Sequence, residues 1–166
     1  NDMLDLRLNS GHLRALGRTL GADVPFFIYG RSALAEGGGD ILSDCPVRPE
    51  LHYVLVNPLF PVSTAWVYRN LVLTSKGDEA NLGRPLGTYN NLLDLLHNDL
   101  ESVTVRHYPI LGQIKRELMG FGADGVLMSG SGPTVFGVFE TRKKARRAAD
   151  EIAVRSCWQV FQARPF

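Results

Sequence analysis

Apolar and polar positions along this chain follow two periods, and each period predicts a different kind of secondary structure. Leucines recur at every third or fourth position over residues 10–20, which predicts an amphipathic helix there. Asn9 and Ser10 supply an N-cap for this helix, and Gly21 stands where a helix commonly ends.

The helical period returns in the second half of the chain. Apolar residues over 92–103 predict one helix, which the segment 98–101 closes. Those over 111–121 predict a second helix, with Pro109 at its start. A third helix follows Thr141 as its cap and carries alanines and an isoleucine on one face.

Short runs of β-branched and aromatic residues predict the strands. They cover residues 26–29, 32–35, 40–42, 53–56, 134–139 and 158–163. A short helix over 65–71 follows the run at 53–56, and Ser63 or Thr64 can cap it.

These elements predict a fold class and a division of the chain. From about residue 51 onward they make an α+β sandwich of the ferredoxin-like type, with helices on one face of an antiparallel sheet. A helix and strands precede it. The proline-rich stretch 44–50 predicts a boundary between residues 1–48 and 49–166, and the polar stretch 74–88 predicts a mobile surface loop.

Composition narrows the classes of function. A net charge of +1 on 166 residues gives no reason to expect nucleic acid or a membrane surface as a partner. No apolar run is long enough to span a bilayer, and no signal peptide is visible. Cys45 and Cys157 have no metal-binding or redox spacing, so we expect free thiols and a cytoplasmic protein. The four histidines are scattered, and we expect no metal site built from them.

The stretch Leu127–Phe136 runs from an apolar segment through a loop of small residues into a second apolar segment. Gly130 and Gly132 allow positive φ angles and a close approach of the backbone to a ligand. Free N–H groups in such a turn form a concavity for anions, and the hydroxyls of Ser129, Ser131 and Thr134 add donors. The alternative is a tight hairpin turn that binds nothing.

Two further residues suggest chemistry. Asp23 sits on a bend stiffened by Pro25, where a carboxylate can accept a proton from a hydroxyl, although a turn Asp more often bonds its own backbone. Tyr68, two residues after Trp66 on the predicted short helix, can stack on a base if it is exposed, or can be a core residue.

Two clusters of charged residues are interpreted as structural rather than as binding sites. The basic run over 142–147 is interpreted as a solvated helix face. Asp99 and Glu101 diverge on a helix, so we interpret them as surface or helix-end groups rather than a metal pair.

Several of these segments, in their order along the chain, resemble the GHMP kinases. The matching segments are 20–27, 33–37, Asn57-Pro58 with Ser63-Thr64, 98–101 and 128–136. The similarity covers nearly the whole chain, and the motifs are specific when they are taken together.

The resemblance implies an enzyme that uses ATP and Mg²⁺ to phosphorylate a hydroxyl of a cytidine-diphospho polyol in non-mevalonate isoprenoid synthesis. It implies that Asp23 is the catalytic aspartate, which takes the proton of the attacking hydroxyl. It implies that Gly130, Ser131 and Gly132 belong to the third glycine motif of the family and line the site beside the phosphates. It also places Tyr68 where an aromatic ring stacks on the cytosine.

The chain departs from the family at its beginning. It starts at Asn1, and neither the glycine- and serine-rich ATP loop nor the family's N-terminal lysine is found. We therefore expect a piece of a longer protein, with the missing N-terminal half as its partner and no activity by itself. Two alternatives stay open: a GHMP kinase for another alcohol, and a non-catalytic ferredoxin-like module that binds an effector through the Gly130–Gly132 turn.

Overall fold

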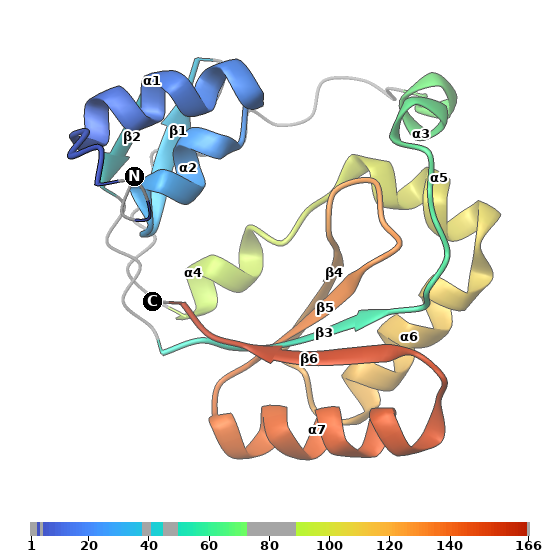
Figure 1. Cartoon of the computed structure of the whole chain (residues 1–166). Helices are drawn as coiled ribbons and strands as arrows, with labels where there is room; N and C mark the ends of the chain where they lie inside the picture. The colour runs from blue at the N-terminus through green and yellow to red at the C-terminus, as the bar shows by residue number, and fades with distance from the viewer. Residues whose placement is uncertain (1–2, 4, 38–40, 45–49, 73–88, 166) are drawn as a thin grey trace. The chain divides into compact units, whose positions relative to one another are not determined.

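The computed structural model describes residue 3 and residues 5–37, 41–44, 50–72 and 89–165. The chain divides into two compact units, residues 1–48 with 165–166 and residues 49–164, and each is described by itself (Figure 1). Cys45, most of the proline-rich connector, the predicted loop over 74–88 and part of the glycine turn near residue 38 lie outside the described residues.

The first unit begins with two helices and continues into a strand pair. Helix α1 (Ser10–Leu20) has the predicted bounds, and the Asn9 side chain caps it by accepting the His12 N–H at 2.9 Å. Helix α2 is followed by strands β1 (Ala33–Glu36) and β2 (Ile41–Asp44), which pair antiparallel.

Helix α2 (Val24–Tyr29) corrects the strand predicted over 26–29. Pro25 lies in the first turn, where its fixed φ favours a helix and its missing N–H costs nothing. Gly30 ends the helix with φ 69°, and its N–H donates to the carbonyl of Phe26. These two end signals outweigh the strand preference of the aromatic and β-branched residues between them.

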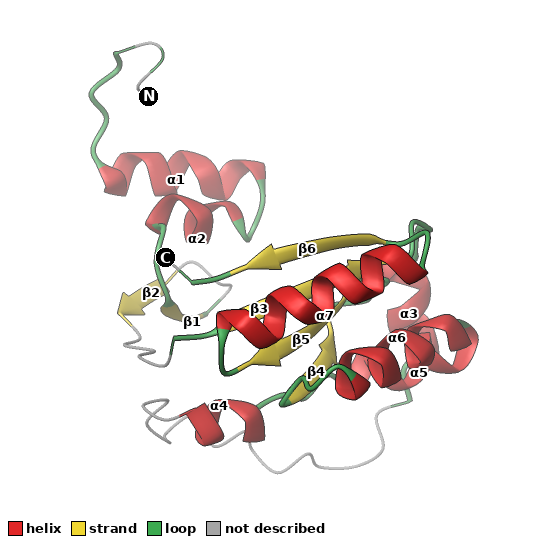
Figure 2. Ribbon diagram, turned by 90° about the horizontal axis from the view of Figure 1, so that it is seen from below, coloured by secondary structure: helices red, strands yellow, loops and turns green. Residues whose placement is uncertain are grey.

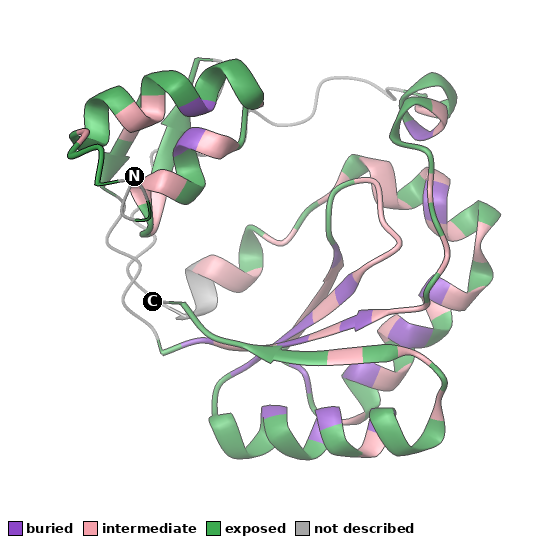
Figure 3. Cartoon of the chain, in the orientation of Figure 1, coloured by how far each residue is buried: buried purple, intermediate pink, exposed green. Residues whose placement is uncertain are grey.

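The packing of α1 against α2 depends on Gly17, which is buried. A Cβ at Gly17 would lie 2.7 Å from Ile28 Cδ1 and 2.9 Å from Val24 Cγ1, so the helices approach through this glycine. Large apolar side chains of the unit are nonetheless exposed, Leu20 by 82% and Phe27 by 76%. Figure 3 shows how little of this unit is buried.

The second unit is built on four antiparallel strands in the order β4-β5-β3-β6. The strands are β3 (His52–Asn57), β4 (Gly125–Met128), β5 (Val135–Phe139) and β6 (Gln159–Ala163). In the central register Leu55 lies opposite both Phe136 and Phe161. This arrangement confirms the predicted α+β sandwich of the ferredoxin-like type.

Helices α6 (Pro109–Gly120) and α7 (Arg142–Arg155) lie against one face of this sheet (Figure 2). Both begin where the sequence predicts, α6 at Pro109 and α7 after its cap Thr141. The core between helices and sheet holds fully buried aliphatic and aromatic side chains, among them Val54, Val56, Leu111, Ile114, Leu118, Val135, Phe139 and Ile152. The basic side chains of α7 face solvent, and Arg146 pairs with Asp150.

The single helix predicted over 92–103 is wrong. The structure has α4 (Tyr89–Asp94) and α5 (Asp99–His107), with Asn98 in an extended conformation between them at φ −151° and ψ 105°. The Asn98 side chain accepts the Leu100 N–H, so this residue opens α5 instead of closing a helix. No described helix has the length and apolar character needed to cross a membrane.

Candidate functional site

The glycine loop, residues 129–134, joins β4 to β5. Two backbone hydrogen bonds hold it: the Ser129 N–H donates to the Thr134 carbonyl at 2.8 Å, and the Gly132 N–H donates to the Ser129 carbonyl at 3.0 Å. Gly130 has φ 54° and Gly132 has φ 85°, conformations that glycine adopts without strain. The predicted glycine turn is therefore a real feature of the second unit.

The two glycines differ in their surroundings. A Cβ at Gly132 would lie 2.7 Å from the sulfur of Met128, whereas a Cβ at Gly130 would meet no atom within 4 Å. Gly132 is therefore packed into the protein, and Gly130 faces open space.

Three side chains, from the N-cap and the body of α5, hold the glycine loop, and none of them is among the site residues predicted from the sequence. Asn98 donates to the carbonyls of Met128 and Gly130, each at 2.8 Å. Glu101, interpreted above as a surface or helix-end group, accepts the Met128 N–H at 2.9 Å and pairs with Lys115. The buried Thr104 hydroxyl lies 3.2 Å from the Ser131 carbonyl. Their spacing of three residues was the available signal, because it places them on one helix face.

Two further hydrogen bonds hold the loop from β3 and from helix α3 (Thr64–Asn70). The Asn57 side-chain amide donates to the Thr134 hydroxyl at 2.9 Å. The hydroxyls of Thr64 and Ser131 lie 2.8 Å apart. Ser63, one of the two predicted caps, caps α3 by accepting the Trp66 N–H.

Some donors of the loop are left over after these bonds. Within the described part of the chain, the N–H groups of Gly130 and Ser131 donate to no acceptor. Neighbouring free N–H groups in a turn with a left-handed residue form a concave site for an anionic oxygen. The loop therefore offers donors that can bind a phosphate or a similar anion.

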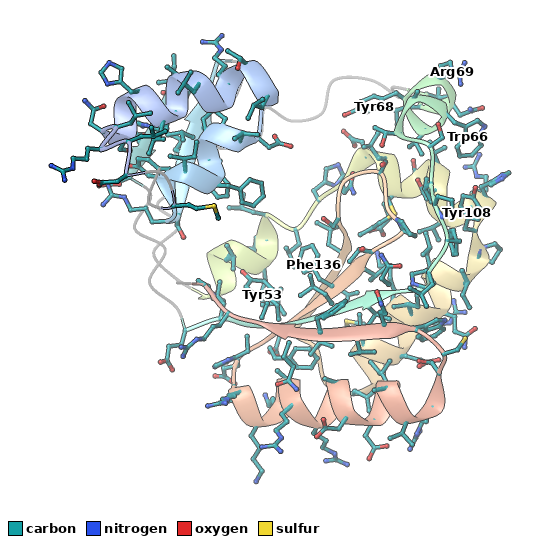
Figure 4. All side chains as sticks on the ribbon, viewed as in Figure 1. Tyr53, Trp66, Tyr68, Arg69, Tyr108 and Phe136 are labelled. Atoms are coloured by element: carbon teal, nitrogen blue, oxygen red, sulfur yellow. The ribbon has the colours of Figure 1, made fainter. Side chains whose placement is uncertain are left out.

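Tyr68 and Trp66 leave α3 in different directions (Figure 4). The Tyr68 side chain is 61% exposed, so its ring is free to stack on a ligand. The Trp66 ring is partly buried, with its centroid 4.5 Å from that of His107. Trp66 and His107 line a separate hollow of about 430 Å³ between α3 and α5, and no predicted site residue lines it.

Asp23 belongs to the first unit and immediately precedes α2. Its backbone carbonyl accepts the Phe26 N–H at 3.1 Å, but its side chain makes no capping hydrogen bond. The side chain is exposed, and no hydrogen bond or ion pair to it occurs within the described residues. The alternative of a turn Asp that bonds its own backbone therefore does not describe this carboxylate.

Metal ligands were not expected from the sequence. Among the described residues no group of three His, Cys, Asp or Glu side chains is placed to hold a metal ion. His97 and Asp99 form an exposed pair at 2.7 Å, which is a surface contact.

A family model described as "GHMP kinases C terminal" matches residues 71–155. The chain belongs to the GHMP kinase family. A 4-diphosphocytidyl-2-C-methyl-D-erythritol kinase from Syntrophotalea carbinolica is 53% identical over 165 residues, which are 99% of this chain and 59% of that protein. The enzyme of the same name from Geobacter sulfurreducens is 52% identical over 94% of this chain and 56% of its own length. The chain thus spans somewhat over half of these curated relatives.

Two solved structures share the fold of this GHMP kinase chain. A crystal structure of 4-(cytidine 5'-diphospho)-2C-methyl-D-erythritol kinase matches with a TM-score of 0.70 and 32% identity, and it covers 97% of this chain and 59% of that one. A homoserine kinase from Cytophaga hutchinsonii matches with a TM-score of 0.72 at 18% identity, over 100% of this chain and 60% of its own. The second likeness shows the fold alone.

Proposed function

We propose that the complete protein to which this chain belongs is a 4-diphosphocytidyl-2-C-methyl-D-erythritol kinase, which transfers a phosphoryl group from ATP to a hydroxyl of that cytidine-diphospho polyol. The observation that carries the proposal is the 53% identity to an enzyme of this name over 99% of the chain. The glycine loop with its free N–H groups supports it, because phosphoryl transfer depends on positioned donors beside the phosphates.

The glycine loop supplies donors in this proposal. The N–H groups of Gly130 and Ser131 bind oxygens of the phosphate groups, and Gly130 leaves the space they need. Gly132 keeps the loop close to Met128, whose sulfur would lie 2.7 Å from a Cβ at this position and would have to move. The loop thereby stabilises negative charge that develops as the phosphoryl group is transferred.

Asp23 accepts the proton of the substrate hydroxyl in this proposal. A general base needs an available carboxylate, and the Asp23 side chain is exposed and free of a capping bond. Proton removal raises the nucleophilicity of the hydroxyl oxygen, which attacks the terminal phosphorus of ATP while the bond from that phosphorus to the bridging oxygen breaks and ADP leaves. The proton stays on the Asp23 carboxyl until solvent removes it.

Tyr68 recognises the cytosine in this proposal. Its ring is 61% exposed on α3, and Thr64 at the start of the same helix bonds to Ser131 of the loop. The ring that would stack on the base and the loop that would bind phosphate are therefore linked directly by the contact between Thr64 and Ser131. A cytidine diphosphate group carries both of the features that these two elements would bind.

The first unit belongs, in this proposal, to the N-terminal domain of the kinase. Its exposed Leu20 and Phe27 would be covered by the remaining part of that domain. The relatives are longer than this chain, and we propose that most of the ATP- and Mg²⁺-binding groups lie in their additional length. ATP is the phosphoryl donor and Mg²⁺ would neutralise its phosphates. We expect the enzyme to work in the cytoplasm, where ATP is available.

The test is a phosphorylation assay on the complete purified protein. With ATP, Mg²⁺ and 4-diphosphocytidyl-2-C-methyl-D-erythritol we expect ADP and a monophosphorylated product, measured by a coupled assay and mass spectrometry. Homoserine and other small alcohols serve as competing substrates. Turnover of another alcohol with none of the cytidine compound would replace the proposed substrate, and no turnover of any alcohol would overturn the kinase assignment.

A further inference from the structure

Helix α5 presents three polar side chains to the glycine loop, and all three bond to its backbone or to the residue before it. Asn98, Glu101 and Thr104 follow one another at intervals of three residues, so they lie on one face of the helix. From these contacts we infer that Asn98 is a positioning residue of the kinase: it aims the Ser131 N–H at the anionic group that the loop binds. The inference rests on the function proposed above and adds a residue to its machinery.

Both donors of the Asn98 side-chain amide are used, and its oxygen accepts a third hydrogen bond. Its Nδ2 donates to the carbonyls of Met128 and Gly130, both at 2.8 Å, and its Oδ1 accepts the Leu100 N–H at 3.1 Å. The two carbonyls flank Ser129, so one amide group fixes the entry into the loop. A carboxylate or a hydroxyl could keep the cap on Leu100, but neither could donate to two carbonyls at once.

The hydrogen bond from Asn98 to the Gly130 carbonyl also fixes the direction of the Ser131 N–H, because both groups belong to one planar peptide unit. In a trans peptide the C=O and the following N–H point in opposite directions. The Gly130–Ser131 bond is trans, since the cis bond in the described chain is Gly132–Pro133. Because the Gly130 carbonyl points to Asn98, the Ser131 N–H must point away from α5. This is the N–H that has no acceptor in the described part of the chain.

Glu101 and Thr104 stabilise the same arrangement. The Glu101 side chain, 17% exposed, accepts the Met128 N–H at 2.9 Å and is paired with Lys115. Thr104 is fully buried, and its hydroxyl lies 3.2 Å from the carbonyls of both Leu100 and Ser131. Together with Asn98, they fix backbone groups at residues 128, 130 and 131. A set of contacts this complete holds donors in place before a ligand arrives, which is what electrostatic catalysis requires.

A simpler role for Asn98 would be that of a helix cap. Two substitutions separate the roles: Asn98→Ser and Asn98→Asp both keep an oxygen that can cap Leu100, but neither side chain can donate to the carbonyls of Met128 and Gly130 together. Asn9→Ser is the matched control, because Asn9 makes the same kind of cap in the first unit, where its side chain accepts the His12 N–H at the start of α1.

The experiment measures steady-state kinetics of the complete protein and its three variants, together with their melting temperatures. We expect both Asn98 variants to lose roughly tenfold to hundredfold in kcat/KM, as small displacements of positioned groups commonly cause. We expect Asn98→Asp to lose more, because its charge faces two carbonyl oxygens, and Asn9→Ser to keep full activity. Wild-type kcat/KM in a folded Asn98→Ser protein would overturn the inference.

A second measurement does not depend on activity. Hydrogen exchange of the Ser129 and Gly132 amides reports whether the loop keeps its two internal bonds. We expect both amides to exchange faster in Asn98→Ser than in Asn9→Ser. If the wild-type protein phosphorylates nothing, the proposed function fails while this readout still tests the role of Asn98. Unchanged exchange would count against that role even in an active kinase.

Discussion

The hydroxyl groups of Thr64 and Ser131 lie 2.8 Å apart, although 67 positions separate the two residues in the sequence. Thr64 is the first residue of α3, and Ser131 is at the centre of the glycine loop. The contact therefore links the helix that carries Tyr68 to the loop that carries the free N–H groups. Either hydroxyl can be the donor in this pair. If one hydroxyl donates to a ligand instead, the other can rotate and donate to it, so the contact between them is kept.

We predict that this pair contributes measurable coupling to the stability of the protein. Thr64→Val and Ser131→Ala should together destabilise by less than the sum of the single variants, with a coupling of about 0.5–1 kcal/mol, as expected for one neutral hydrogen bond at an exposed site. Urea unfolding of the four proteins measures it. Thr64→Val combined with Ser102→Ala is the control pair and should be additive, because Ser102 bonds to the Asp99 carbonyl instead. Additivity in the first pair as well would show that the contact contributes nothing.

Alanine substitution should distinguish the two glycines of the loop. Gly130→Ala should cost about 1–2 kcal/mol for the left-handed backbone alone, because its Cβ meets nothing within 4 Å. Gly132→Ala should cost about 1–3 kcal/mol more, because its Cβ would lie 2.7 Å from the sulfur of the buried Met128. Thermal unfolding of both variants tests this order. Equal losses would mean that Met128 moves aside freely.

Local signals were enough to predict much of this fold. Pro109 and the apolar period after it define α6, Thr141 caps α7, and the continuous apolar run at 53–56 lies within β3. Each of these elements is set by residues close in sequence. The strand predicted over 26–29 is a helix because Pro25 and Gly30, at its two ends, outweigh the residues between them.

The candidate site was only partly predictable, because its supports come from distant parts of the chain. The glycine loop is visible in the sequence, but Asn98 contacts it across some thirty residues, and nothing local predicts such a bond. The sequence pattern predicts Asn98 near the end of a helix, because the apolar period continues from α4 into α5 on both sides of this residue. An Asn can stand at either end of a helix, and the apolar pattern alone does not show that Asn98 begins α5.

We predict that Tyr68 contributes to substrate affinity and little to stability. Tyr68→Ala should weaken binding of the cytidine-diphospho substrate to the complete protein by about 1–3 kcal/mol, the range observed for a base stacked on an aromatic ring. Its melting temperature should hardly change, because the side chain is 61% exposed. Calorimetric titration measures the affinity. Tyr68→Phe keeps the ring and should bind like the wild type, and full affinity in Tyr68→Ala would exclude stacking.

The chain of 166 residues should not phosphorylate the substrate by itself. It spans 59% of the relative from Syntrophotalea carbinolica, and we propose that the groups which hold ATP lie mostly in the remainder. Phosphoryl transfer needs the nucleotide to be held in line with the attacking oxygen, which one carboxylate and one loop cannot achieve. Parallel assays of this chain and the complete protein, with ATP titrated calorimetrically into each, test the prediction. Robust ATP-dependent turnover by the 166 residues would contradict it.

Replacement of Asp23 should abolish turnover while the substrate still binds. In the complete protein, Asp23→Asn keeps the size of the side chain and removes its ability to accept a proton, so we expect kcat to fall by on the order of 10²–10⁴-fold. Stability should change little, because the carboxylate makes no capping bond whose loss would matter. Rapid-quench measurement of a single turnover, with substrate affinity determined in parallel, separates chemistry from binding. Glu36→Gln, an exposed carboxylate on β1 of the same unit, is the matched control and should keep wild-type turnover. A near-normal single-turnover rate in Asp23→Asn would exclude Asp23 as the base and direct the search to a carboxylate elsewhere in the complete protein.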